Sequence, residues 1–135
     1  MNPKADTAKR VVLQRIAGEL QPVALGRAKF RIGTSTIHVR FCSENQASPT
    51  KYKFNINPNT LSADHEVWIC GSSNWFYLAP ISAMNHMYNH PDSYPDRLHP
   101  EITVVSLDTS GHRVTYALGG QTLDFSPYFQ ATVGG

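Results

Sequence analysis

The chain has 135 residues, of which 41% are hydrophobic and 16% charged, and this composition favours one globular domain, residues 1–135, over a disordered chain or a coiled coil. No apolar run approaches the ~20 residues that cross a bilayer, and the first residues lack the apolar stretch of a secretory signal, so we expect a cytoplasmic protein without a membrane partner. The net charge of +2 hides an asymmetry, because residues 1–53 contain ten Lys and Arg against three acids, whereas residues 54–135 contain two against seven.

The first half of the chain predicts one helix and three strands. Residues 5–20 read as a helix, because Ala8, Val12, Ile16 and Leu20 recur at four-residue spacing before Gln21-Pro22. Three alternating segments then predict strands at 28–32, 36–42 and 51–56.

The second half predicts a strand pair, a helix and a hairpin. The strand pair covers 65–71 and 75–80, the helix 81–90, and the hairpin 101–108 and 113–119, with a last strand or extended segment at 122–129. This order predicts an α+β fold with a central mixed, mainly antiparallel sheet, one long N-terminal helix and a short later helix.

Basic side chains alternate with the apolar ones in the three strands of the first half. If these strands are neighbours in one sheet, six side chains share one surface: Lys29, Arg31, His38, Arg40, Lys51 and Lys53. Like charges that face each other on a sheet repel, so an anionic partner, above all a DNA phosphate backbone, is expected there. The alternative is that these side chains are scattered on strands that are not adjacent.

The segments "FRIGTSTIHVRFCS" and "EVWICGSSNWFYLAP", together with the leading helix, resemble the PD-(D/E)XK nuclease superfamily of restriction- and homing-endonuclease-type domains over about residues 7–90. The resemblance implies a sheet in which one strand supplies an Asp and the next an acid-x-Lys pair. In that superfamily the acids hold Mg²⁺ and the Lys assists the attacking water.

The residues at these motif positions depart from the pattern. Arg31 lies near the Asp position, and His38-Val39-Arg40 replaces the acid-x-Lys pair. The resemblance therefore implies a DNA-binding domain that has lost catalysis and needs no metal or cofactor, working as a homodimer or beside a partner subunit. Replacing both Arg31 and Arg40 with Glu is expected to weaken DNA binding and to leave the melting temperature nearly unchanged.

Two other functions remain open from the sequence. One is an active Mg²⁺-dependent endonuclease with a rearranged site made of Glu19, Glu44 and His38. The other is a protein-interaction subunit whose basic face meets an acidic protein.

Four further features have a structural and a functional interpretation. His86 and His90 have half of a zinc-site spacing, and Cys42 and Cys70 are two single thiols, of which Cys70 is expected to be buried and inert. The aromatic run 75–77 with Trp68 is expected in the core and alternatively stacks on bases. The proline-rich loop 89–100 is either a rigid connection or a base-reading loop that uses Tyr94, Arg97 and His99.

Overall fold

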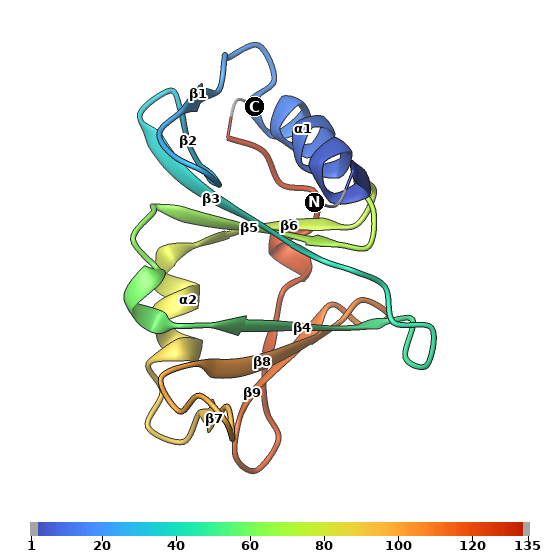
Figure 1. Cartoon of the computed structure of the whole chain (residues 1–135), viewed down its shortest axis with the longest axis vertical. Helices are drawn as coiled ribbons and strands as arrows, with labels where there is room; N and C mark the ends of the chain where they lie inside the picture. Colours follow the sequence, from blue (N-terminus) through green and yellow to red (C-terminus); the bar gives the residue numbers. More distant parts are fainter. Residues whose placement is uncertain (1–2, 134–135) are drawn as a thin grey trace.

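The computed structural model of the protein describes residues 3–133, which form two β-sheets and two α-helices (Figure 1). One helix covers the outer face of the first sheet, and the inner face of that sheet packs against the second sheet. The predicted α+β class is confirmed, as are the long N-terminal helix, the short later helix and a mixed sheet.

Helix α1 (Pro3–Ala17) lies across the first sheet and buries one stripe of side chains: Ala5, Ala8, Val12, Leu13, Ile16 and Ala17. The helix ends three residues earlier than the hydrophobic pattern predicts. Gly18 has φ +62° and its amide donates to the carbonyl of Gln14 at 3.1 Å, which is a left-handed helix end that glycine adopts without strain. Leu20 therefore lies outside the helix and is 42% exposed.

The first sheet has the strand order β1-β2-β3-β5-β6. Its strands are β1 (Val23–Ala24), β2 (Lys29–Ile32), β3 (Ser35–Cys42), β5 (His65–Cys70) and β6 (Phe76–Pro80). Strands β3 and β5 pair in parallel, and the other neighbours pair antiparallel. Strand β1 is two residues long and was not predicted from the sequence.

The second sheet has the order β10-β9-β8-β4, and the short β7 (Tyr94–Pro95) also pairs with β8. Its strands are β4 (Lys51–Ile56), β8 (Thr103–Asp108), β9 (Arg113–Ala117) and β10 (Gln121–Asp124). The chain thus leaves the first sheet after β3, forms β4 at the edge of the second sheet, and then returns to the first sheet, where β5 pairs with β3.

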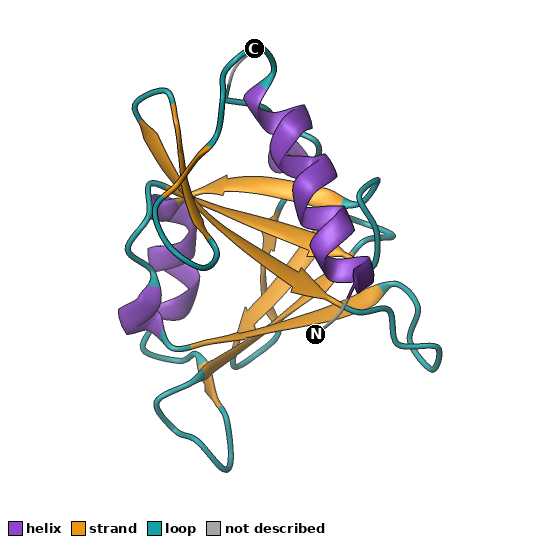
Figure 2. Ribbon diagram, turned by 45° about the horizontal axis from the view of Figure 1, so that its top comes forward, coloured by secondary structure: helices purple, strands orange, loops and turns teal. Residues whose placement is uncertain are grey.

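Helix α2 (Ile81–Tyr88) lies between the two sheets on one side of the molecule (Figures 1 and 2). Its buried residues Met84, Met87 and Tyr88 belong to the inter-sheet core, which is dominated by aromatic side chains from both sheets. The core under α1 is separate and mainly aliphatic.

Short 3₁₀ helices occur at Pro58–Thr60 and Ser126–Tyr128, the latter directly after β10. The following segment runs along the outer side of β6: Tyr77 forms an antiparallel bridge with Phe129, and the Gln130 amide donates to the Phe76 carbonyl at 3.0 Å. The amide of Val133 then donates to the Ile16 carbonyl at the end of α1. None of the described helices is long and apolar enough to cross a bilayer.

Candidate nucleic-acid interface

The two sheets separate the six basic residues predicted to share a surface. Lys29 pairs with His38 across β2 and β3, and Arg31 with Thr36, so four of the six lie on one face of the first sheet. Lys51 and Lys53 lie on the second sheet, where Tyr52, Phe54 and Ile56 point into the core. The two lysines are therefore exposed on the outer face of β4, pointing away from the first sheet, and the six side chains form no common surface.

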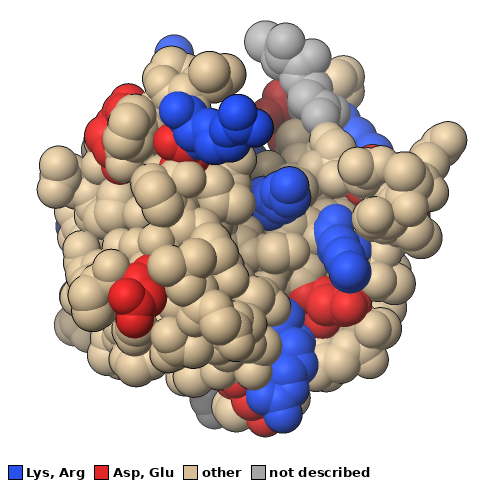
Figure 3. Space-filling view, turned by 90° about the horizontal axis from the view of Figure 1, so that it is seen from below, with Lys and Arg blue, Asp and Glu red and all other residues tan. Residues whose placement is uncertain are grey.

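Lys51 belongs to a row of alternating charges on the second sheet. Strand pairing places Lys51 opposite Asp108, Asp108 opposite Arg113, and Arg113 opposite Asp124. Opposite charges in cross-strand pairs stabilise a sheet. Figure 3 shows this end of the molecule from below, with Lys and Arg interspersed among Asp and Glu. Lys51 thus has an acidic cross-strand neighbour, whereas Lys53 lies opposite Ser106.

Arg40 points toward the inter-sheet core and meets a buried carboxylate. Its Nε donates to Oε1 of Glu66 at 2.6 Å, and its Nη2 lies 3.4 Å from Oε2. Glu66 is fully buried on β5, directly opposite His38, and Arg40 is 21% exposed. Glu66 is absent from the site residues predicted from the sequence, although it is the one acid inside the most apolar predicted strand. Burial raises the pKa of Glu66, and the Arg40 hydrogen bond and charge partly offset that effect.

His38 completes this cluster as a neutral side chain. Arg40 Nη2 donates to its Nδ1 at 3.1 Å, so the imidazole proton is assigned to Nε2. Burial, and to a smaller extent the charges of Arg40, Lys29 and Lys9, together lower the pKa of His38 from 6.5 to about 4. The pair that replaces the acid-x-Lys motif is therefore one neutral side chain and one cation already paired with an acid.

The depressed pKa of His38 predicts a loss of stability in mild acid. The unfolded chain binds the proton more tightly than the folded state does, so stability present above pH 6.5 is lost as the pH falls toward 4. Compared with His38→Gln, the wild-type protein should lose about 2–3 kcal/mol of unfolding free energy across that window. Urea unfolding of both proteins at several pH values measures the difference.

The comparison with His38→Gln isolates the histidine. The raised pKa of Glu66 acts in the opposite direction, because the folded state then gains stability as that carboxyl is protonated. Since Glu66 is present in both proteins, its contribution largely cancels in the difference. A difference that stays constant between pH 7 and 4 would contradict a neutral, partly buried His38.

The three residues of the alternative magnesium site do not come together. Glu44 follows β3 and lines a pocket with Lys4, near the start of α1, whereas Glu19 follows the other end of that helix. A helix of this length spans about 20 Å, and His38 lies within β3 beside Glu66. No group of three or more His, Cys, Asp or Glu positioned for a metal is found within residues 3–133.

The aromatic residues, the cysteines and the loop histidine that the sequence suggested as functional have contacts typical of core or turn residues, apart from Trp75. Trp68, Phe76 and Tyr77 are buried as expected, whereas Trp75 is 43% exposed. Both cysteines are free thiols, and burial raises the pKa of Cys70, as expected for an inert thiol. The loop residue His99 lies in a turn in which the Asp96 carboxylate accepts its backbone amide at 2.9 Å.

The histidines of α2 contact an aromatic side chain. His86 Nε2 is 3.0 Å from the hydroxyl of Tyr116, and the His90 ring lies edge-on to the same tyrosine, 5.5 Å away. Two imidazoles and a phenol do not make the four-ligand set of a structural zinc site.

An open groove of about 940 Å³ lies between α1 and the segment that leads into β2. Lys9 and Arg10 border it on the helix, Arg27 borders it on the loop, and Phe30 contributes an apolar surface. Asp6 is the one carboxylate among the lining residues, and none of the three cations makes a salt bridge within the described part of the chain. These three cations are among the ten Lys and Arg of residues 1–53, but the sequence does not show that they border one groove.

A scan against models of known protein families found no match for this chain, and no curated protein sequence matches it significantly.

Proposed function

We propose that the chain is a nucleic-acid-binding domain that contacts a DNA phosphate backbone through the groove between α1 and β2. The observation that carries the proposal is the set of three unpaired cations around this groove: Lys9, Arg10 and Arg27. Phosphate contacts by Lys and Arg release counterions and supply much of the affinity for DNA. The resemblance to the PD-(D/E)XK superfamily supports the same partner.

The residues at the positions of the PD-(D/E)XK motif support DNA binding without metal-dependent cleavage. An Mg²⁺ site needs carboxylate oxygens, whereas Arg31 and Arg40 place positive charge there. The carboxylate that contacts Arg40, Glu66, is fully buried and accepts from its guanidinium at 2.6 Å. A divalent cation at this position would have to displace the guanidinium from its buried partner.

Fluorescence anisotropy of a labelled mixed-sequence DNA duplex at 50 and 200 mM salt tests the proposal. Three phosphate contacts predict a fall in affinity of roughly 40-fold between these concentrations. Arg10→Gln combined with Arg27→Gln should weaken binding at 50 mM at least tenfold and reduce the slope of log affinity against log salt by about 1.8. The duplex should remain intact when Mg²⁺ is added.

The matched control is Lys51→Gln combined with Lys53→Gln, which removes the same charge from the outer face of the second sheet. This variant should bind within about twofold of the wild type, because its lysines lie away from the groove. Equal weakening by both double variants would show that net charge, and not the groove, determines affinity. No binding at 50 mM salt would reject the proposed function.

A further inference from the structure

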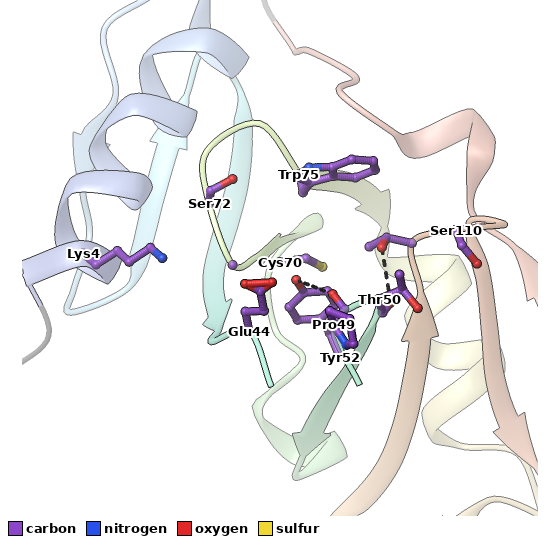
Figure 4. Close-up of a pocket in the computed structure, with 11 residues that line it drawn as sticks. Lys4, Glu44, Pro49, Thr50, Tyr52, Cys70, Ser72, Trp75 and Ser110 are labelled. Atoms are coloured by element: carbon purple, nitrogen blue, oxygen red, sulfur yellow. Dashed lines mark hydrogen bonds between the residues drawn. The ribbon is translucent and has the colours of Figure 1, made fainter. Parts of the chain in front are cut away.

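A second cavity lies at the side of the inter-sheet core opposite α2, where three connections converge. It has a volume of about 320 Å³, and its walls come from the β3–β4, β5–β6 and β8–β9 connections, with Lys4 of α1 at one border. Figure 4 shows Glu44 on one side of this pocket, Trp75 on another and the Cys70 thiol between them. The size is at the lower end of the range for small-ligand sites.

The pocket contains charged groups without partners. Within residues 3–133, neither Glu44 nor Lys4 makes a hydrogen bond or salt bridge through its side chain. The indole of Trp75 is 43% exposed although it borders a cavity. The two carboxylate oxygens of Glu44, the ammonium group of Lys4 and the exposed part of the Trp75 indole are thus available to a ligand.

Gly71 keeps the pocket open. Its φ of +79° is unfavourable for other residues, and a Cβ there would lie 3.0 Å from the Tyr52 hydroxyl and 3.6 Å from Cβ of Glu44. A side chain at this position would fill the space beside the carboxylate. The backbone of the β5–β6 turn therefore maintains the cavity that Glu44 borders.

We propose that this pocket binds a guanine nucleotide. A planar base stacks on the exposed indole of Trp75, as bases do on aromatic side chains in nucleic-acid-binding proteins. The Watson–Crick edge of guanine presents two adjacent N–H donors, at N1 and N2, which match the two oxygens of the Glu44 carboxylate. The ribose and phosphate extend from N9, at the end of the base opposite this edge, and so point away from Glu44 and from Lys4, which lies beyond it (Figure 4).

The same groups disfavour other small ligands. Adenine presents an unprotonated N1 at the corresponding edge, which would face the carboxylate of Glu44 with a lone pair. A simple organic cation would match Glu44 but would meet the like charge of Lys4. The site lies on a different side of α1 from the basic groove and is independent of the proposed DNA contact.

Titration with GMP, with IMP and AMP as comparison probes, tests the inference by isothermal calorimetry and by the indole N–H resonances in ¹H–¹⁵N spectra. We expect saturable GMP binding, about tenfold weaker IMP binding because N2 is lost, and no saturation with AMP. The Trp75 indole resonance should shift, while that of the buried Trp68 should not. Equal affinity for GMP and AMP, or no binding of GMP at millimolar concentration, would overturn the inference.

Variants then assign the contacts. Glu44→Gln should weaken GMP binding at least tenfold, and Trp75→Ala should abolish it, whereas Glu101→Gln, which changes an exposed carboxylate in the loop before β8, should have no effect. Unchanged GMP affinity in Glu44→Gln would reject the assigned orientation of the base. The outcome is separable from the DNA proposal, because duplex binding depends on Arg10 and Arg27 and GMP binding on Glu44 and Trp75.

Discussion

Replacing Arg40 with methionine is expected to lower the free energy of unfolding by about 3–5 kcal/mol, because it leaves the carboxylate of Glu66 buried without its partner. Glu66 has no exposed surface, and its shortest polar contact is the 2.6 Å hydrogen bond from Arg40 Nε. His38 is neutral and supplies no compensating charge. Urea unfolding at pH 7, with the midpoint shifted and the slope unchanged, measures the loss.

A second variant separates the buried charge from a general packing defect. Arg40→Met combined with Glu66→Met removes both charges and should recover most of the stability, since an apolar pair of similar volume often replaces a buried ion pair without loss. The single Arg40→Met variant should also regain stability as the pH falls, because the pKa of Glu66 is raised in the folded state and the folded protein binds that proton preferentially. If the double variant were as unstable as the single one, packing rather than charge would explain the effect.

This ion pair changes one expectation from the sequence. Arg31→Glu combined with Arg40→Glu was expected to leave the melting temperature nearly unchanged, which requires both side chains to be exposed. Arg31 is exposed, but Arg40→Glu would place a second carboxylate against Glu66. We now expect the double variant to unfold at a much lower temperature and Arg31→Glu alone to retain the wild-type melting temperature, as measured by calorimetry.

Replacing Trp68 with alanine is the second substitution with a large expected effect, about 3–5 kcal/mol. Its ring stacks on Phe54 with centroids 4.3 Å apart and an interplanar angle of 8°, and it contacts Tyr88 edge-on. Because Phe54 belongs to the second sheet and Trp68 to the first, the substitution removes a contact that joins the two layers. Calorimetric unfolding measures the loss.

Trp68→Phe provides a matched comparison. Nε1 of Trp68 is buried and lies close enough to the Glu66 carboxylate to lower its pKa, although without good hydrogen-bond geometry, so phenylalanine removes only this weak contact while retaining a stacking ring. We expect this variant to lose less than half as much stability as Trp68→Ala. Trp75→Ala, at an exposed indole, should cost about 1 kcal/mol or less. Equal losses of unfolding free energy in Trp68→Ala and Trp75→Ala would contradict the conclusion that Trp68 joins the two sheets.

The alternation of apolar and polar residues predicted where the strands lie, but it did not predict which strands pair with each other. The apolar side of 51–56 was identified correctly, and Tyr52, Phe54 and Ile56 are buried. Alternation does not specify which sheet a strand joins, because the same pattern suits any half-buried strand. Placing β4 in the second sheet therefore separated Lys51 and Lys53 from the other basic residues.

Local backbone geometry and tertiary contacts account for the remaining differences. The four-residue hydrophobic spacing of α1 continues to Leu20, but the positive φ of Gly18 ends the helix first. The acidic partner of Arg40 lies 26 residues away on β5, and only the parallel pairing of β3 with β5 brings it close. The groove cations likewise come from a helix and a loop whose packing the sequence does not specify.

The segment that runs along β6 protects the first sheet from unwanted association. Without the Phe129 and Gln130 contacts, β6 would offer free backbone amides and carbonyls beside the apolar residues Phe76 and Leu78. Such an open sheet edge is a template for pairing with a strand of another molecule. Proteolytic cleavage shortly after β10 would thus convert a protected edge into a site of intermolecular strand addition, and with it aggregation.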